Sequence, residues 1–577
     1  MRNQTIAKIF YNLSFYLAME DVPFKPQAYE KAAMALESFP QDLGALYKKE
    51  GLKGLESIPG VGKSIAEKIE EYLKTGKIKY YEDFKKQMPL AIDELTLVGG
   101  IGPKMVRDLW NNLKIKNLKD LEKAAKVGKI KNLPGFGEKT EQNILQSIEF
   151  VKKSKGRWLL GEMVPYAEEY LNVLKNSGLV KEAEVAGSLR RMKETVGDID
   201  ILVTSKNPKK AIEYFLSKIK YEKLWGKGQA KVSVHTAQGF DVDVRVLPED
   251  TFGAGLQYFT GSKEHNVKLR TYAAGKGFKV SEYGVFKMAP PAGGKRIACK
   301  TEQQVYEALG MPYIEPELRE DQGEIEAALS GKLPNIIPYN SLRGDLQVQT
   351  NWTDGAHSIE EMAKEAKKHG LQYIAITDHT KDLAMTGGLD EKKLLRQMAE
   401  IDLLNKKISG IKILKGAEVN IRKDGTLDID DDVLLKLDVV GVSVHSNFKM
   451  AKKDMTARII RAIQNPNVDI LFHPTGRSMP KRDEYEVDID EVLAEAKKTG
   501  TAVEINAQPK RLDLRDAYIR KALGRGVLIV VDSDAHSKDQ FEFLRYGISQ
   551  ARRGWAEAKD VINTQPLDKF LKLLKNG

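Results

Sequence analysis

The pattern of hydrophobic and polar positions divides the chain into three parts. Over residues 1–150 amphipathic helical stretches dominate, beginning with MRNQTIAKIFYNLSFYLAME. Between 151 and 317, helical stretches alternate with strand-like runs such as GDIDILV and FDVDVRVLP. Beyond residue 338, short β-rich runs, among them YIAIT, DVVGVSV and VLIVV, alternate with amphipathic helical stretches. This last pattern predicts a (β/α) barrel.

Length and composition narrow the class of protein. A chain of 577 residues is expected to form three or four domains, and its 30% of charged residues is typical of a soluble protein. The single Cys299 excludes an internal disulfide framework and fits a reducing cytosol. The first twenty residues lack a secretory apolar core, and no other stretch is apolar enough to span a bilayer. We therefore expect a cytoplasmic protein.

The net charge of +11 is unevenly distributed along the chain. It is +4 over residues 1–150, +7 over 151–317 and zero over 318–577. A basic excess confined to the first 317 residues favours a polyanionic partner for that part. A solvated lysine-rich surface is the alternative explanation.

An internal repeat occurs three times in the helical part. IPGVGKSIAEKI begins at Ile58, VGGIGPKMVRDL at Val98 and LPGFGEKTEQNI at Leu133. In each copy two glycines allow a tight turn and close approach of a ligand to the backbone. The helix that follows presents free N–H groups and the positive end of its dipole, which suits an anion such as a DNA phosphate.

This repeat resembles the helix-hairpin-helix element, which binds the sugar-phosphate backbone of DNA. The resemblance implies salt-dependent, sequence-independent DNA binding. The third copy has Glu138 and Glu141 in its helix, and for that copy we expect a structural role. The implied DNA-binding positions are Gly60, Gly62, Gly100, Gly102, Gly135 and Gly137.

Two strand-like segments carry acids at the strand period of two. Asp198 and Asp200 of GDIDILV point to one face, as do Asp241, Asp243 and Arg245 of FDVDVRVLP. Carboxylates held side by side repel each other unless a cation lies between them. A divalent ion such as Mg²⁺ is the simplest cation for such oxygen ligands. For either segment alone, a solvent-facing acidic edge is the alternative.

Together with GSLRR, YFTGS and GFKVSEYGVF, these segments are similar to the family X DNA polymerases, the group of DNA polymerase beta. The resemblance covers about residues 1–317. It implies that Asp198, Asp200 and Asp243 hold two Mg²⁺ (or Mn²⁺) ions, with Asp243 near the primer 3′-hydroxyl. Asp241 shares the strand face, but Asp243 has the matching context before Val-Arg.

The same resemblance implies a nucleotide-binding set. Two positions, Lys263 and His265, depart from the vertebrate enzyme, which has an acid and an aromatic there, so the packing on the base stays open. The implied set comprises Ser188 and Arg191 on the β- and γ-phosphates, Tyr258, Phe259 and Gly261 on the sugar, Asn266 at the minor groove and Arg270 on the template side.

Lys68, in the helix of the first hairpin, matches the lyase lysine of the same family. Schiff-base chemistry at an abasic site needs a neutral amine. Glu71, at i+3, is expected to raise the pKa of Lys68 instead, and Ser64 stands where the family has a supporting lysine. A phosphate-binding or surface lysine is the alternative to a 5′-deoxyribose phosphate lyase.

The strand-like runs of the barrel end in candidate metal ligands, as this architecture leads one to expect. Four of the chain's eight histidines fall at these ends. Asp378 and Glu504 fall there too. The set resembles the polymerase and histidinol phosphatase (PHP) domain, over about residues 338–577, and this resemblance implies a trinuclear Zn²⁺/Mn²⁺ centre that hydrolyses phosphodiesters. The implied ligands are Asp354, His379, Glu418, His445, His473, Asp534 and His536.

Gln347 and Gln349 occupy the positions of the family's HxH pair. A neutral amide oxygen is a poor ligand for Zn²⁺ or Mn²⁺ compared with an imidazole nitrogen. We therefore expect a partly filled centre, with 3′–5′ exonuclease or phosphoesterase activity weakened or lost.

The predicted architecture is multidomain: helix-hairpin-helix, an α+β nucleotidyltransferase palm with a thumb, and a distorted TIM-like PHP barrel. The expected function is gap-filling DNA polymerisation by a monomer, using deoxynucleotides and gapped or primer–template DNA. The alternatives are a PHP-type 3′-end phosphoesterase to which the N-terminal part delivers DNA, and a non-catalytic DNA-end binding protein. The predicted domains are a lyase-like domain with the first hairpin (1–90), further hairpins (91–150), palm (151–250), thumb (251–317), linker (318–337) and PHP domain (338–577).

Overall fold

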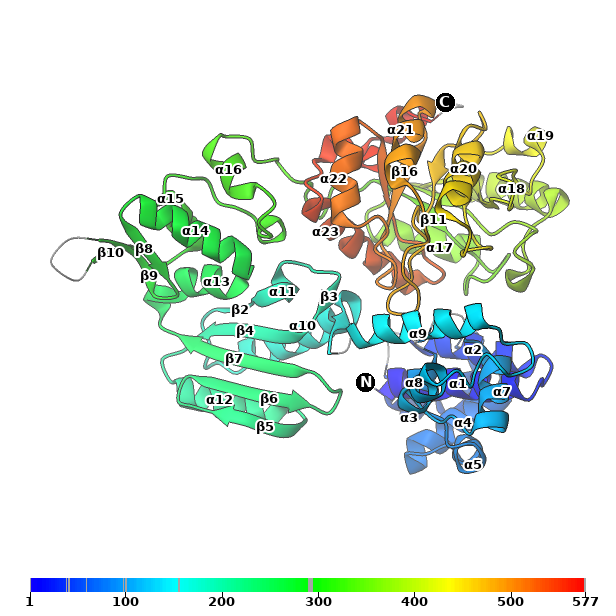
Figure 1. Cartoon of the computed structure of the whole chain (residues 1–577), viewed down its shortest axis with the longest axis horizontal. Helices are drawn as coiled ribbons and strands as arrows, with labels where there is room; N and C mark the ends of the chain where they lie inside the picture. The colour runs from blue at the N-terminus through cyan, green and yellow to red at the C-terminus, as the bar shows by residue number, and fades with distance from the viewer. Residues whose placement is uncertain are drawn as a thin grey trace.

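The structure is a computed structural model that describes residues 2–37, 39, 42–58, 60–96, 98, 101–153, 156–288 and 294–574. It consists of a helical N-terminal body, a palm with a five-stranded sheet, a thumb and a C-terminal barrel (Figure 1). In that view the palm and thumb, in green, extend away from the blue N-terminal body and the yellow-to-red barrel. The predicted fold class is confirmed. Within the described ranges, no helix has the length and apolarity that crossing a membrane requires.

The helices of the N-terminal body share one hydrophobic core. Their apolar residues recur at helical spacing, as with Ile65 and Ile69 of α4 (Lys63–Thr75), and this stripe is buried. Helix α9 (Glu138–Lys153) leads from the body towards the palm (Figure 1). The others are α1 (Arg2–Met19), α2 (Lys25–Glu37), α3 (Leu43–Glu56), α5 (Lys79–Gln87), α6 (Ile92–Leu95), α7 (Pro103–Leu113) and α8 (Leu118–Lys126).

The palm sheet has the strand order β2-β4-β7-β6-β5, in which only β4 and β7 are parallel neighbours. Along β4 (Asp198–Thr204) and β7 (Asp241–Leu247) apolar residues alternate with acids, and the apolar face packs on two helices. The acids therefore lie on the opposite face. The remaining elements are β1 (Trp158–Leu159), α10 (Leu160–Lys175), β2 (Ala183–Val185), α11 (Gly187–Arg190), β3 (Thr195–Val196), α12 (Pro208–Lys218), β5 (Tyr221–Lys227) and β6 (Lys231–Thr236).

The thumb combines three helices with a small antiparallel sheet of order β10-β9-β8. Its elements are η1 (Glu249–Thr251), α13 (Phe252–Thr260), α14 (Lys263–Gly275), β8 (Phe278–Ser281), β9 (Gly284–Lys287), β10 (Lys295–Ala298) and α15 (Glu302–Glu307).

The segment 318–337, predicted as a linker, is a packed part of the thumb. It contains α16 (Glu324–Leu329) and follows η2 (Pro316–Leu318). Arg319 is fully buried, with its Nη1 2.6 Å from Glu302 Oε1. Its buried Glu324 pairs with a thumb histidine. These long-range contacts, rather than local sequence, order the segment.

The C-terminal part is a seven-stranded parallel sheet in which the strands follow their order in the chain. A bridge between Val348 and Ala535 joins the first strand to the residues after the last one, so the sheet curls into a nearly closed barrel. Its strands are β11 (Gly344–Val348), β12 (Tyr373–Ile376), β13 (Lys412–Asn420), β14 (Val439–Ser443), β15 (Ile470–Leu471), β16 (Ala502–Asn506) and β17 (Ile529–Asp532).

Helices surround this barrel and cover its apolar strands (Figure 1). They are α17 (Ile359–Lys368), η3 (Ala384–Thr386), α18 (Glu391–Lys407), α19 (Asp431–Leu434), α20 (Lys452–Ile463), α21 (Ile489–Thr499), α22 (Asp516–Arg525), η4 (Lys538–Phe543), α23 (Leu544–Arg553), η5 (Ala558–Asp560), η6 (Ile562–Thr564) and α24 (Leu567–Leu571).

The palm and the barrel share a packed interface. Leu512 and Tyr546 of the barrel belong to the hydrophobic core of the palm. At the start of α10, a Cβ on Gly161 would lie 2.5 Å from Pro509 Cγ, so only glycine allows this approach. Arg477 of the barrel, 3% exposed, donates to both carboxylate oxygens of the palm residue Glu194. The interface is therefore apolar with a buried ion pair.

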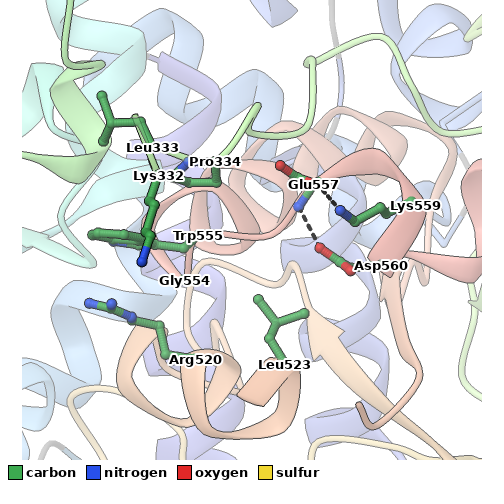
Figure 2. Close-up of a pocket in the computed structure, with 10 residues that line it drawn as sticks. All are labelled: Lys332, Leu333, Pro334, Arg520, Leu523, Gly554, Trp555, Glu557, Lys559 and Asp560. Carbon is green, nitrogen blue, oxygen red and sulfur yellow. Dashed lines mark hydrogen bonds and ion pairs between the residues drawn. The ribbon is translucent and has the colours of Figure 1, made fainter. Parts of the chain in front are cut away.

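A second junction joins the thumb to the barrel. There a cavity of about 340 Å³ is lined by Lys332, Leu333 and Pro334 on one side (Figure 2). On the other side the Arg520 guanidinium lies 3.8 Å from the ring centroid of Trp555. None of the candidate catalytic residues lines this cavity.

Candidate active sites in the palm and the barrel

The palm site is formed where β4 and β7 run parallel. Their register sets Asp198 beside Asp241 and Asp200 beside Asp243. Since side chains alternate across the sheet, all four carboxylates share the face opposite the apolar core. The register therefore places the acids of these two separated segments side by side.

Asp241 and Asp243 differ in their partners. Asp241 accepts hydrogen bonds from Trp225 Nε1, at 2.9 Å, and from His235 Nδ1, at 2.7 Å. Although partial burial opposes them, these bonds lower the pKa of Asp241. Asp243 instead faces two cations, with Lys231 Nζ at 2.8 Å and Arg245 Nη2 at 3.6 Å from its Oδ2. Asp241 is thus bound by Trp225 and His235, whereas Asp243 is paired with Lys231 and Arg245.

The two acids of β4 repel each other and the acids of β7, and their pKa values are raised. Burial, followed by the charges of Asp198 and Asp243, raises the pKa of Asp200 to about 7. Burial and the charges of Asp243 and Asp241 also raise the pKa of Asp198. A divalent cation bound between these carboxylates would offset their repulsion. The donor set, carboxylate oxygens alone, fits Mg²⁺ or Mn²⁺.

The glycine–serine turn lies against these acids. At Gly187, which has φ +62°, a Cβ would come 2.6 Å from Asp200 Oδ2. Ser188 follows at the start of the short helix α11. Arg191 is held at the thumb, because its Nε donates to Glu320 at 2.9 Å and its Nη1 donates to the Thr260 carbonyl. Arg191 is therefore near the predicted phosphate site but already paired.

The sugar and base positions lie on α13 and α14. The side chains of Tyr258 and Phe259 are partly exposed, and the ring of Phe259 has the Arg245 guanidinium 4.7 Å from its centroid. Gly261 is packed on Arg191 and has φ +70°. Asn266 is engaged internally, donating to the Tyr258 carbonyl at 2.7 Å. Exposed Arg270 donates to the Asn266 carbonyl at 3.2 Å.

His265, left open by the sequence, does not face the nucleotide side. It is fully buried, with Nδ1 2.6 Å from Glu324 Oε1 and Nε2 3.0 Å from the Tyr306 hydroxyl. His265 therefore fastens the segment after the thumb, while the adjacent Lys263 is exposed.

Two hairpins present helix ends without side-chain caps. Gly62 precedes α4 and Gly102 precedes α7, and neither helix start is capped by a side chain. Gly60 and Gly135 have φ near +78°, as the turn requires. Gly100 lies outside the described residues. Free N–H groups at such ends suit phosphates.

In the third hairpin, whose helix α9 follows Gly137, a glutamate of that helix binds backbone N–H groups of the preceding loop. Glu141 Oε2 accepts hydrogen bonds from the backbone N–H groups of Ile130, at 2.9 Å, and Lys131, at 3.0 Å. This contact gives the copy an internal role, in keeping with its acidic helix.

Lys68 lines a cavity of about 890 Å³ in the N-terminal body. Its Nζ lies 6.0 Å from the ring centroid of Tyr29 and 5.6 Å from that of Tyr80. Burial lowers the pKa of Lys68 by more than Glu67 and Glu71 raise it. The expectation that Glu71 would dominate was wrong, because aromatic rings partly desolvate the amine.

In the barrel, Glu418 is the centre of the candidate metal site. It is 1% exposed, and its Oε1 lies 2.9 Å from His473 Nε2 and 3.1 Å from His445 Nε2. Burial alone would raise the pKa of Glu418, but His379 and His445 hold it well below its usual range. Imidazole nitrogens with a shared carboxylate are the donor set that Zn²⁺ and Mn²⁺ prefer.

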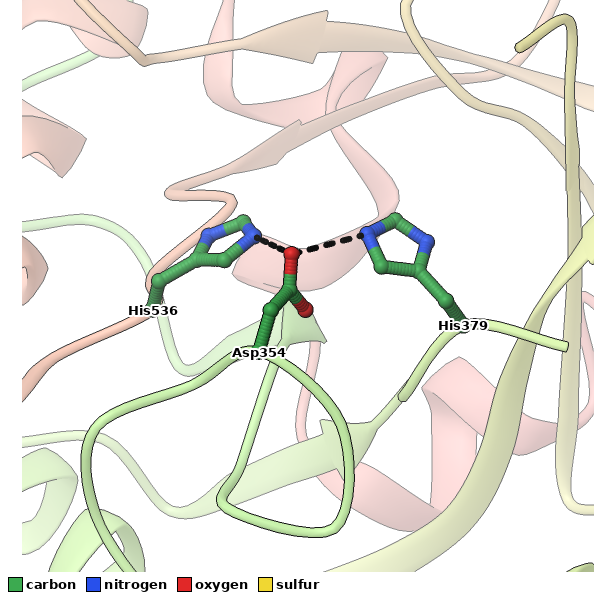
Figure 3. A group of neighbouring side chains, drawn as sticks. All are labelled: Asp354, His379 and His536. Atoms are coloured by element: carbon green, nitrogen blue, oxygen red, sulfur yellow. Dashed lines mark ion pairs between the residues drawn. The ribbon is translucent and has the colours of Figure 1, made fainter. Parts of the chain in front are cut away.

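A second group meets at Asp354. Its Oδ2 lies 3.7 Å from His379 Nε2 and 3.7 Å from His536 Nε2 (Figure 3). The other oxygen, Oδ1, is buried and has no hydrogen-bond partner among the described residues. The ligand atoms of Asp354, His379 and His536 all lie within 4.8 Å of one another, as do those of His379, Glu418 and His445. Asp534 lies beside this second group, with Oδ1 3.8 Å from His536 Nδ1.

The two glutamines are held by hydrogen bonds inside the barrel. Gln349 Nε2 donates to Glu418 Oε2 at 2.8 Å, and Gln347 Oε1 accepts from Asn506 Nδ2 at 3.1 Å. Asn506 also donates to Asp534 Oδ2 at 3.1 Å. An amide thus occupies Glu418 Oε2, and neither glutamine offers an imidazole nitrogen. The donors at this third position do not fit Zn²⁺ or Mn²⁺.

Two acids at the strand ends support the site rather than enter either group of three. Asp378 accepts from Thr350, Thr353 and Gln397 and so fixes the loop that carries Asp354. Glu504 accepts from the His473 backbone N–H at 2.6 Å.

Sequence reasoning missed Asn420, whose Oδ1 lies 2.7 Å from His445 Nδ1. That contact turns Nε2 of His445 towards Glu418. Its only sequence signal is its position at the end of a strand, two residues after Glu418.

Four protein families match parts of the chain. A helix-hairpin-helix domain matches residues 1–78 and a SAM-like helix-hairpin-helix tandem matches residues 92–149. The DNA polymerase beta thumb matches residues 255–320, and the PHP domain matches residues 345–508.

Known proteins share these parts in different combinations. A probable phosphatase of Thermoanaerobacter sp. is 37% identical over 204 residues, which cover 33% of this chain and 78% of that protein. DNA polymerase lambda of Arabidopsis thaliana is 26% identical over 354 residues, covering 55% of this chain and 62% of that protein. DNA polymerase/3′-5′ exonuclease PolX of Bacillus subtilis is 37% identical over 580 residues, covering 100% of both chains. The chain therefore belongs to the bacterial family X DNA polymerases that carry helix-hairpin-helix elements, a polymerase beta thumb and a C-terminal PHP domain.

Proposed function

We propose that this chain fills short gaps in DNA during repair, adding deoxynucleotides to a primer end. The observation that carries this proposal is the parallel register of Asp200 beside Asp243, next to the turn at Gly187. Mg²⁺ or Mn²⁺ bound to Asp198, Asp200 and Asp243 would lower the pKa of the primer hydroxyl and neutralise the leaving pyrophosphate.

In this proposal the residues around the acids bind and orient the nucleotide. Ser188 and Arg191 hold its β- and γ-phosphates through charge-assisted hydrogen bonds. Arg191 then exchanges its bond to Glu320 for the phosphate, which ties nucleotide binding to the thumb. Tyr258, Phe259 and Gly261 pack on the sugar, Asn266 contacts the minor groove, and Arg270 contacts the template side.

The uncapped helix starts after Gly62 and Gly102 hold the DNA backbone, independently of sequence. Binding through them falls steeply with salt concentration. Gly60 and Gly100 belong to the same two turns, and the hairpin of Gly135 and Gly137 contributes less, since Glu141 closes it.

For the PHP domain we propose a 3′–5′ exonuclease or phosphoesterase centre with two Zn²⁺ or Mn²⁺ positions instead of three. The first is held by His379, Glu418 and His445, with His473 beside the same Glu418 oxygen, and the second by Asp354, His379 and His536. The hydrogen bonds of Gln347 and Gln349 support the loss of the third, at which Asp534 keeps a carboxylate. Trimming of DNA ends is then weaker than in relatives with the HxH pair.

The test is a labelled gapped duplex incubated with deoxynucleotides, with Mg²⁺ and Mn²⁺ supplied separately. We expect extension into the gap with either ion and slow 3′ trimming with Mn²⁺. Trimming without extension would favour the rival function, a PHP-type phosphoesterase to which the N-terminal part delivers DNA.

A second activity is favoured by the cavity around Lys68. Because burial lowers the pKa of this amine, we propose that it forms a Schiff base with the deoxyribose aldehyde of an abasic site. Borohydride should trap a covalent DNA adduct in the wild type and in Lys74→Met, whose lysine is paired with Glu70. An undiminished adduct in Lys68→Met would overturn the assignment.

A further inference from the structure

Arg511 lies beside the barrel site and has no role in the functions described so far. It follows β16 on the loop that contains Gln508, whose carbonyl accepts from the Arg511 backbone N–H at 2.7 Å. Its guanidinium Nε lies 3.6 Å from Asp534 Oδ2, a long ion pair. The side chain is 22% exposed, so solvent and ligands reach part of it.

The donors of this guanidinium are largely unused. Among the described residues, no acceptor lies within hydrogen-bond distance of Arg511 Nη1, although this atom is buried. Other buried arginines of the barrel use most of their donors: Arg477 donates to Glu194 and to the Leu512 carbonyl, with only its Nε unpaired among the described residues, and Arg458 donates to three backbone carbonyls. A buried donor without a partner is costly, so an exogenous acceptor is expected at this point.

The position of Arg511 identifies that acceptor. Arg511 lies against Asp534, itself 3.8 Å from His536 Nδ1 of the second ligand group. Asn506 bridges Asp534 to Gln347, so Arg511 borders the position from which the imidazole pair is missing.

We infer that Arg511 binds a non-bridging oxygen of a nucleotide phosphate in the PHP centre, and supplies positive charge where the HxH ligands are absent. The planar fork of a guanidinium matches a phosphate, and such charge-assisted bonds are short and strong. This inference rests on the proposed phosphoesterase function of the barrel. The bland alternative is that Arg511 only holds its loop through Asp534, in which case metal content rather than phosphate affinity would depend on it.

The experiment uses the full chain loaded with Mn²⁺ and compares wild type, Arg511→Met and Arg511→Lys. The matched control is Arg515→Met, because Arg515 pairs with Glu484 instead of facing the ligand groups. Bound Mn²⁺ is counted by mass spectrometry, and affinity for thymidine 5′-monophosphate and for inorganic phosphate is measured by calorimetry. The nucleotide distinguishes a nucleotide site from one that accepts any free phosphate.

We expect equal Mn²⁺ content in all four proteins. Thymidine 5′-monophosphate should bind about 10- to 100-fold more weakly to Arg511→Met, less weakly to Arg511→Lys, and unchanged to Arg515→Met, as for the loss of a hydrogen bond to a charged group. If circular dichroism shows that Arg511→Met does not fold, Arg511→Lys is compared with the wild type instead.

Unchanged nucleotide affinity in the Arg511 variants would overturn the inference and leave the proposed function standing, as would a loss of Mn²⁺ from them. If the Arg511 substitutions weakened the binding of inorganic phosphate but not of thymidine 5′-monophosphate, the proposed nucleotide specificity would be wrong. A wild-type chain that bound no Mn²⁺ and trimmed no DNA would overturn both the proposed function and this inference.

Discussion

The palm and the barrel each gather acidic side chains at strand positions, but they stabilise them differently. In the palm, Asp198 and Asp200 stand beside like charges, and their pKa values are raised. In the barrel, Glu418 is surrounded by imidazoles, and its pKa is lowered. Of the described residues, groups of three ligand atoms within 4.8 Å of one another occur only in the barrel.

The palm acids repel each other until a cation binds, whereas the barrel ligands attract each other as soon as the chain has folded. The palm acids lie on the sheet face opposite the apolar core, and among them Asp243 pairs with Lys231 and Arg245. A divalent cation would relieve the repulsion among them. The barrel ligands are buried or half-buried, and hydrogen bonds such as the one between Asn420 and His445 orient them, so folding alone brings them together.

The largest expected effect in the barrel is at Glu418, whose carboxylate serves the first ligand group. Glu418→Gln should lose bound Mn²⁺ and reduce 3′ trimming by more than the ~10- to 100-fold typical of outer-shell partners. Extension into a gap should be unaffected. Mn²⁺ content and both DNA reactions are measured, with Glu365→Gln on the outer helix α17 as the control. Equal trimming by the two variants would contradict the assignment of the barrel site.

Restoring the HxH pair at positions 347 and 349 should strengthen metal binding in the barrel. Gln347→His combined with Gln349→His frees Glu418 Oε2 from its amide partner and adds two imidazole ligands. We expect about one additional Mn²⁺ per chain and roughly tenfold faster trimming, because imidazole is the better ligand. Metal counting and trimming rates test this. An unchanged metal count would show that more than these two residues was lost.

The pKa of Asp200, about 7, predicts pH-dependent metal binding in the palm. Between about pH 4 and pH 7 the folded chain keeps a proton that an unfolded aspartate releases, so metal-free stability falls as pH rises through this window. Mg²⁺ must displace that proton below pH 7. Its affinity should therefore rise about fivefold from about pH 6 to pH 7, and only about twofold more up to about pH 8, as followed by calorimetry. An affinity constant from pH 6 to pH 8 would contradict the raised pKa.

The smallest expected effect concerns Lys231, which lies 2.8 Å from Asp243 Oδ2. Lys231→Met removes a competing cation, and Mg²⁺ should bind the palm a few-fold more tightly. Lys227→Met on the exposed strand β5, whose lysine faces Glu213, is the control. Weaker Mg²⁺ binding in Lys231→Met would mean that this lysine orients Asp243 for the ion instead of competing with it.

Local periodicity made much of this predictable. A period of two set Asp198 and Asp200 on one face, and ligands at successive strand ends of a parallel barrel converge because those ends meet. Glycine pairs before helices marked the hairpins. Each of these signals lies within a few residues of sequence.

The features that could not be predicted depend on partners far apart in the chain. Arg191 is held by Glu320, and His265 is buried against Glu324. The same contacts turn a Pro- and Gly-containing segment into part of the thumb. No periodic pattern reports that Asn420 orients His445, since that requires the register of β13 beside β14.

The central claim is that Asp243 joins Asp198 and Asp200 at the primer end while its neighbour Asp241 does not. Asp243→Asn and Asp241→Asn remove the same charge from the same strand, so their gap-filling rates under saturating Mg²⁺ compare the two directly. We expect Asp243→Asn to extend at least ~1000-fold more slowly than wild type, and Asp241→Asn to stay within about tenfold of it. Equal rates for the two variants, or a greater loss in Asp241→Asn, would contradict the account.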